Sequence, residues 1–124
     1  MDMCPTTDHG CGARGVRFRK LEIQVFPEVL TIYINRRLVR GGKDHRRLEY
    51  PLRLTLPSCS AEYWLRSVVV HDGQRAASGH YFSFVNFGGD WFKFNDDTIE
   101  KATVRQVMHS QATLLVYEAS EQQV

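Results

Sequence analysis

Residues 67–97 read SVVVHDGQRAASGHYFSFVNFGGDWFKFNDD, and this stretch decides the fold. Two segments rich in aromatic residues, Tyr81–Phe87 and Asp90–Phe94, lie on either side of Gly88-Gly89. A glycine pair between two such segments favours a two-residue β-turn, because glycine adopts the positive φ angles that this turn requires. We therefore predict a β-hairpin over 81–94, preceded by a loop over Asp72–Gly79.

The two-residue turn determines which residues face each other. Counting outward from the turn, His80 lies opposite Asp97, and Asn95 is its diagonal neighbour. Opposed and diagonal residues share a face of a sheet, so these three side chains are expected on one face. Asp96 is expected on the other face. A one-residue bulge would exchange Asn95 for Asp96.

A histidine held in this way suits base catalysis. A general base offers one ring nitrogen to a nucleophile, while an acceptor holds the other nitrogen and fixes the tautomer. The side-chain oxygen of Asn95 can do this without adding a charge, which suits a thiolate–imidazolium pair. Gly79 leaves the approach to His80 open, and the 72–79 loop can close over an extended substrate. The alternative interpretation is a surface histidine on an aromatic-rich hairpin.

The rest of the chain indicates further strands and a single helix. Val29–Ile34 is almost wholly apolar, which is typical of a strand covered on both faces. Thr103 can cap a helix over 103–110, with Gln106 at the capping-box position. The predicted class is α+β, mostly antiparallel sheet with one short helix. The other strands are expected at Val16–Val25, Leu48–Leu56, Tyr63–His71 and Ala112–Tyr117.

The composition is that of one globular domain in a reducing compartment. The 124 residues are 43% hydrophobic and 24% charged, which is ordinary for such a domain. A net charge of +2 does not indicate nucleic acid or a membrane surface as a partner. No apolar run has the length of a membrane span, and no secretory signal is recognisable. Three cysteines do not suggest a disulfide framework. We expect an intracellular protein, in the cytoplasm or the nucleus.

Two other segments each have more than one interpretation. Asn35–Arg47 holds six arginine and lysine residues and one acid, which fits a solvated hairpin tip or a patch for nucleic acid or an acidic partner. No aromatic residue is interleaved with these charges, which favours the tip. Near the N-terminus, Cys4, His9 and Cys11 are of zinc-ligand type, but there is no Cys-x-x-Cys pair. We expect a loop there, without a metal or other cofactor.

Three spaced motifs resemble the histidine box of the ubiquitin-specific proteases, the papain-like cysteine deubiquitinases. They are YWLRSVVVHDG at 63–73, SGHY at 78–81 and WFKFND at 91–96. The segments FPEVLTI at 26–32 and TLLVY at 113–117 are similar to further segments of that family. The resemblance covers residues 16–117 and implies the palm-like, mostly antiparallel half of a papain-like protease.

The resemblance also implies residue roles. His80 would be the catalytic base, Asn95 the residue that orients it, and Asp96 an adjacent polar residue that assists. The reaction would be thiol-dependent hydrolysis of isopeptide or peptide bonds at the ubiquitin C-terminus, through an acyl-enzyme. Ubiquitin or a ubiquitinated protein would then be the partner. A substrate-binding loop over the ubiquitin tail would comprise His71, Asp72, Gly73, Ser78, Gly79 and Tyr81.

The family's nucleophilic cysteine stands in an Asn-x-Gly-Asn-Thr-Cys-Tyr segment, which these 124 residues do not contain. Cys4, Cys11 and Cys59 lack that context. We therefore expect a chain that supplies the His/Asn half of a deubiquitinase site, is inactive alone and needs a cysteine-box half-domain. The alternative is a catalytically inactive ubiquitin-binding or interaction module. Residues 1–15 would be a loop remaining from the family's fingers, 16–119 the histidine-box part, and 120–124 a polar tail.

Overall fold

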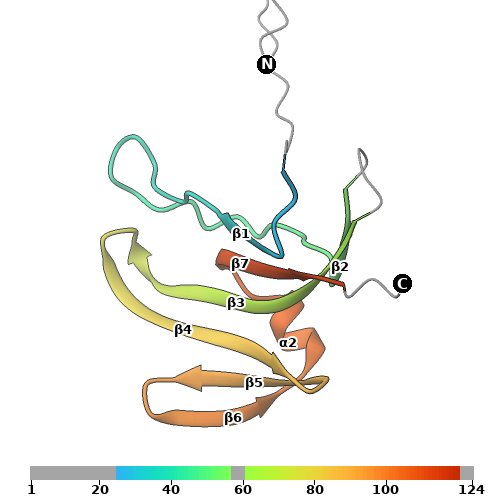
Figure 1. Ribbon diagram of the computed structural model, residues 1–124. Helices are drawn as coiled ribbons and strands as arrows, with labels where there is room; N and C mark the ends of the chain where they lie inside the picture. Colours follow the sequence, from blue (N-terminus) through green and yellow to red (C-terminus); the bar gives the residue numbers. More distant parts are fainter. Residues whose placement is uncertain (1–24, 57–60, 121–124) are drawn as a thin grey trace, which may run out of the picture.

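The computed structural model describes residues 25–56 and 61–120, which form a strongly twisted antiparallel sheet with one short helix (Figure 1). The predicted α+β class is therefore confirmed. In chain order the elements are β1 (Val29–Tyr33), β2 (Arg53–Thr55), β3 (Glu62–Arg75), β4 (Ser78–Phe87), β5 (Asp90–Asn95), β6 (Thr98–Ala102), α2 (Val104–Met108) and β7 (Ala112–Ala119).

The sheet is organised around β3, its longest strand. The order of strands is β1-β7-β3-β4-β5-β6, and β2 also pairs with β3. One edge of β3 pairs with β7 along most of its length. The other edge is shared, because β2 pairs with the residues around Tyr63 and β4 pairs with Ser67–Arg75. As a result β3 carries the chain from the core to the outer end of the hairpin with β4.

The burial of β3 follows from its sequence. Tyr63, Leu65, Val68 and Val70 are buried, whereas the residues between them are exposed or half-buried. The alternation slips by one residue after Leu65, where the register with β7 also shifts, as a β-bulge requires. These four buried side chains therefore point to the same side of the sheet.

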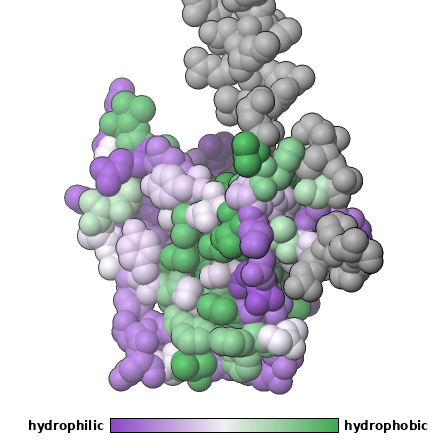
Figure 2. All heavy atoms as spheres, in the orientation of Figure 1, coloured by the Kyte–Doolittle hydropathy of each residue, from purple (hydrophilic) through white to green (hydrophobic). Residues whose placement is uncertain are grey.

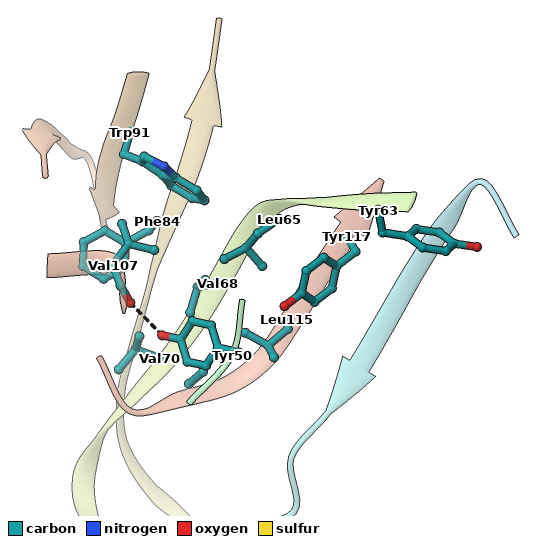
Figure 3. Packing of buried hydrophobic residues seen from close by; sticks show 11 residues of the cluster. Tyr50, Tyr63, Leu65, Val68, Val70, Phe84, Trp91, Val107, Leu115 and Tyr117 are labelled. Atoms are coloured by element: carbon teal, nitrogen blue, oxygen red, sulfur yellow. Dashed lines mark hydrogen bonds between the residues drawn. The ribbon is translucent and has the colours of Figure 1, made fainter. Parts of the chain in front are cut away.

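The core lies between this side of the sheet and α2. Val107 is the buried residue of α2, and it packs in one cluster with residues of β3, β4, β5 and β7 (Figure 3). Tyr50, which precedes β2, joins the cluster, and its hydroxyl donates to the carbonyl oxygen of Val107 at 2.6 Å. This bond satisfies a polar group that burial would otherwise penalise.

The predicted helix and its cap are confirmed. The side chain of Thr103 accepts from the Gln106 backbone at 3.1 Å, and the Gln106 side chain accepts from the Thr103 backbone at 2.8 Å. This reciprocal capping box satisfies amide groups that a helix of five residues cannot pair internally. The helix is shorter than predicted, since it ends at Met108.

Several strand predictions need correction. Of Leu48–Leu56 only Arg53–Thr55 forms a strand, because Pro51 cannot donate to a ladder. β1 is an edge strand whose residues alternate between exposed and half-buried, so it is not covered on both faces. Strands at Tyr63–His71 and Ala112–Tyr117 are confirmed, and both extend further than predicted. The predicted strand Val16–Val25 lies outside the described residues apart from Val25.

Apolar side chains gather down the middle of the face shown in Figure 2, between hydrophilic margins. Large apolar residues with more than half of their surface exposed include Val29, Tyr33 and Tyr81.

Within residues 25–56 and 61–120, no helix is long and apolar enough to cross a membrane.

Candidate active site

The hairpin of β4 and β5 brings His80 and Asn95 together. Its register is the predicted one, with Phe87 opposite Asp90 and Ser83 opposite Phe94. Gly88 and Gly89 have φ angles of 59° and 96°, the positive values that a tight turn between the strands requires. Diagonal neighbours on such a ladder lie within reach of each other. The His80 ring nitrogen Nε2 lies 2.5 Å from Oδ1 of Asn95, so the predicted contact is present.

The hydrogen bond determines the tautomer of His80. A side-chain amide oxygen only accepts, so Nε2 carries the hydrogen when it bonds to Oδ1 of Asn95. In the neutral ring Nδ1 then has the free electron pair. About half of the His80 side-chain surface is exposed, 47%. The ring is therefore oriented by one nitrogen and accessible to a reaction partner.

Asp96 lies nearer to His80 than the ladder predicts. We expected Asp96 on the opposite face of the sheet and Asp97 opposite His80. Instead, β5 ends at Asn95, and a two-residue turn leads into β6, with Asn95 paired to Thr98. Asp96 has a φ of 55° in this turn, and its Oδ2 lies 3.9 Å from Nε2 of His80. Its side chain is 76% exposed, so solvent screens this interaction.

The predicted loop over Asp72–Gly79 is wrong. β3 continues to Arg75 and β4 begins at Ser78, which leaves a turn of only Ala76 and Ala77. The polar, glycine-rich composition suggested a loop because this end of the hairpin extends beyond the core, where apolar side chains are not needed for backbone pairing. Asp72 pairs with His80 across the ladder.

Glycine at position 79 permits close packing behind His80. Gly79 has a φ of 140°, and a Cβ atom there would lie 2.5 Å from the carbonyl oxygen of Asp72 and 2.7 Å from Nε2 of His71. A Cβ at Gly73 would likewise lie 2.7 Å from the Ser78 carbonyl oxygen. The imidazole of His71 therefore packs against both glycine positions. The two glycines let the strands approach while the register shifts by one residue beyond Asp72.

The other predicted loop residues divide between buried and exposed positions. His71 is 5% exposed, and its ring lies 4.6 Å from that of Tyr81, centre to centre. Tyr81 itself is 57% exposed. Asp72 and Ser78 are exposed. A cavity of about 390 Å³ lies beside β3 and is lined by Asp72 and His71 among others. His80 does not line it, but its ladder partner Asp72 does.

Two functional candidates were missed in the sequence, Arg36 and Lys43. Both were assigned to a solvated hairpin tip, yet they are only 5% and 6% exposed. The Nζ atom of Lys43 donates to the backbone carbonyls of His71 and Gly73. Arg36 continues the inward alternation of Ile32 and Ile34, a signal that could have identified it as buried. Lys43 has no comparable signal in the sequence.

Burial lowers the pKa of Lys43 below its ordinary value, and the nearby charge of Arg36 lowers it further. Asp72 acts in the opposite direction. Neither Lys43 nor Arg36 belongs to an ion pair among the described residues. Asp44 lies near in sequence, but it pairs with Arg46 at 2.8 Å.

No group of three or more His, Cys, Asp or Glu side chains in the described part of the chain could hold a metal ion. The cysteines at 4, 11 and 59 lie outside the described residues, and so does the predicted zinc-free loop at 1–15. Chemically, the described site offers an oriented, accessible imidazole with a neutral acceptor on one side and a carboxylate nearby.

The sequence model of the ubiquitin carboxyl-terminal hydrolase family matches residues 3–117, which is most of the chain. The chain belongs to the ubiquitin carboxyl-terminal hydrolase family. Its hairpin with His80 and Asn95 is thus part of a fold that this family uses, as the resemblance of the motifs implied.

Relatives within the ubiquitin carboxyl-terminal hydrolase family come from fungi and mammals. The chain is 34% identical over 109 residues to the probable ubiquitin carboxyl-terminal hydrolase 16 of Schizosaccharomyces pombe, covering 80% of this chain and 24% of that protein. It is 31% identical over 123 residues to the human ubiquitin carboxyl-terminal hydrolase 3, covering 88% of this chain and 24% of that protein. The chain spans about a quarter of the length of these curated relatives.

Solved structures show the same fold. The SAGA DUB module of Ubp8, Sgf11, Sus1 and Sgf73 bound to monoubiquitin contains a chain that superposes with a TM-score of 0.77 at 29% identity. The match covers 95% of this chain and 29% of that one. A yeast SAGA DUB module with a mutant Sgf73 gives a TM-score of 0.69 at 33% identity, over 78% and 26% of the two chains.

Proposed function

We propose that the chain supplies the base half of a thiol-dependent deubiquitinase site. The hydrogen bond from His80 Nε2 to Asn95 Oδ1 carries this proposal, because it lies within the residues that match the ubiquitin carboxyl-terminal hydrolase family. Such a bond gives an imidazole one fixed tautomer and one free nitrogen, which is what a general base for a thiol needs.

The reaction assigns one task to each group. Nδ1 of His80 takes the proton of a cysteine thiol, and the resulting thiolate attacks the carbonyl carbon at the end of ubiquitin. The imidazolium, held by Asn95, then returns that proton to the leaving amine as the bond to it breaks. Water, deprotonated by the same nitrogen, then attacks the thioester. The carbon–sulfur bond breaks, the cysteine sulfur takes the proton back from Nδ1, and ubiquitin leaves with a free carboxyl group. Asn95 remains neutral throughout and acts as a positioning residue.

Asp96 has an auxiliary role in this proposal. Its carboxylate, 3.9 Å from Nε2, adds a favourable charge when His80 is an imidazolium. Because the side chain is largely exposed, we expect this contribution to be small compared with that of Asn95.

The thiol comes from a segment that these 124 residues do not contain. The cysteine-box lobe would be contributed by another stretch of polypeptide, and ubiquitin or a ubiquitinated protein would be the substrate. The ubiquitin-bound DUB module with the same fold supports this choice of partner.

The test is turnover of a fluorogenic amide at the ubiquitin C-terminus. We expect no turnover by the chain alone, and turnover when a family member's cysteine-bearing lobe is added as a separate polypeptide. His80→Ala should lower it at least about a hundredfold, whereas His109→Gln, a change at another exposed histidine, should leave it unchanged. A turnover rate that His80→Ala leaves unchanged contradicts the proposal. Ubiquitin binding without any turnover would instead support a non-catalytic binding module.

A further inference from the structure

Lys43 joins two segments that are distant in sequence. Its Nζ atom donates to the carbonyl oxygen of His71 at 2.7 Å and to that of Gly73 at 3.0 Å. The residue is only 6% exposed, so water does not compete for these donors as it would at the surface. The basic segment that contains Lys43, residues 35–47, is thereby attached to β3 at the outer part of its hairpin with β4.

The two carbonyl groups lie beyond Val70, the last residue of β3 that pairs with β7. Asp72 still pairs with His80, but the register shifts by one residue before the next pair, Arg75 and Ser78. A backbone carbonyl on a strand edge that no other strand pairs needs another donor. Lys43 supplies donors on both sides of Asp72. It therefore holds the backbone that lies directly opposite His80.

The segment that presents Lys43 is itself anchored. Arg37 and Lys43 form an isolated β-bridge, and the turn between them is closed by the bond from Gly41 N to Leu38 O at 3.0 Å. At its base, Arg36 donates through Nε to the carbonyl of Ala112 in β7 at 2.8 Å. The Lys43 side chain is thus held at its backbone by the basic segment and at its ammonium group by β3.

A buried ammonium without a carboxylate partner costs folding free energy. Arg36 and Arg46 are cations of the same segment, and Asp44 is already paired with Arg46. Asp72 is the acid that favours the charged form of Lys43. An apolar residue of similar length would avoid the cost of burial, but it could not donate to the two carbonyls. A lysine at position 43 therefore contributes these two hydrogen bonds, which an apolar residue of similar length, such as methionine, cannot make.

We propose that Lys43 is a positioning residue for His80, acting through the backbone of residues 71–73. The inference rests on the proposed function only for the catalytic meaning of His80. In structural terms, the basic segment and the His80 hairpin form one unit, so that a change in the 35–47 segment is transmitted to the His80 imidazole.

The test compares Lys43→Met with Arg40→Met, which removes the same charge from an exposed position in the same segment. We expect Lys43→Met to raise amide hydrogen exchange at residues 71–80 by about tenfold or more, with amides of β5 and β7 unchanged. The imidazole ¹⁵N shifts of His80 should also move toward a mixture of tautomers. Arg40→Met should change neither readout, and Lys43→Arg should restore part of both.

Equal exchange in Lys43→Met and Arg40→Met, with an unchanged His80 tautomer, would overturn the proposal. If Lys43→Met does not fold, NMR of the lysine ammonium groups in the wild-type chain provides the test. The proposal requires slow exchange of the Lys43 ammonium protons and hydrogen-bond couplings to the carbonyl carbons of His71 and Gly73. A freely rotating ammonium contradicts it. These readouts do not involve turnover, so they are independent of whether the chain takes part in hydrolysis.

Discussion

Replacing Gly79 by alanine should destabilise the His80 hairpin far more than an alanine at a glycine whose added methyl group meets open space. The methyl carbon would lie 2.5 Å from the carbonyl oxygen of Asp72 and 2.7 Å from Nε2 of His71. The first is a backbone atom, so it cannot move aside without opening the ladder between β3 and β4. The φ of 140° adds backbone strain for any residue with a Cβ.

A variant at a second glycine separates the cost of the steric overlap at Gly79 from the cost of the backbone conformation. Gly88 has a positive φ of 59°, and a Cβ there has no neighbour within 4 Å among the described residues. Gly88→Ala therefore costs only the backbone term, about 1–2 kcal/mol. Gly79→Ala has a backbone term at least as large, because a φ of 140° lies outside the left-handed α region, and it adds an overlap of about 1–3 kcal/mol, for a total of at least about 2–5 kcal/mol. The gain from restricting the unfolded chain applies to both variants and cancels in their difference.

The assay is urea unfolding of both variants, monitored by tryptophan fluorescence, together with the ¹H–¹⁵N spectrum of each folded state. We expect Gly79→Ala to lower the free energy of unfolding by about 1–3 kcal/mol more than Gly88→Ala. Its shift changes should centre on residues 71–80. Equal losses for the two variants would refute the close packing of His71 and Asp72 on Gly79.

Three other perturbations test the fold. Val107→Ala empties a fully buried site between α2 and the sheet and should cost about 2 kcal/mol in urea unfolding; a loss below about 0.5 kcal/mol would argue against this core. Thr103→Ala removes the cap of α2 and should cost about 1 kcal/mol, whereas Thr103→Ser should be nearly neutral. Burial raises the pKa of the Tyr117 hydroxyl to about 12. The protonated hydroxyl therefore stabilises the folded chain fully below pH ~10, the ordinary pKa of an unfolded tyrosine, and this stabilisation is lost as the pH rises toward 12. Unfolding midpoints of wild type and Tyr117→Phe should therefore converge at alkaline pH, and a constant difference would contradict the assignment.

The contact between His80 and Asn95 was predictable because it depends on a short-range rule. A glycine pair fixes a two-residue turn, the turn fixes the register, and the register brings diagonal neighbours together. The same rule failed beyond Asn95, since Asp96 adopts a left-handed conformation that begins a new turn. Strand β6 was missed for a related reason: Thr98–Ala102 is mostly exposed and polar, so it carries no alternation that would indicate an edge strand.

The contribution of Lys43 could not be predicted from one sequence. Its role depends on carbonyls 28 and 30 residues away, which lie on β3 beyond the last residue that pairs with β7. Charge within a segment indicates solvent exposure on average, and it does not distinguish the two cations that tertiary contacts bury. The end of the hairpin was mistaken for a loop because its side chains are polar, whereas its backbone pairing continues.

A double-mutant cycle on His80 and Asn95 tests the central claim most directly, that Asn95 acts by orienting the base. The measurement is kcat for the fluorogenic ubiquitin amide, with the chain complemented by a cysteine-bearing lobe. Asn95→Ala should lower kcat at least about tenfold when His80 is present, and should have no further effect in the His80→Ala background. Losses that multiply as independent effects, or an Asn95→Ala variant with unchanged kcat, would contradict the account.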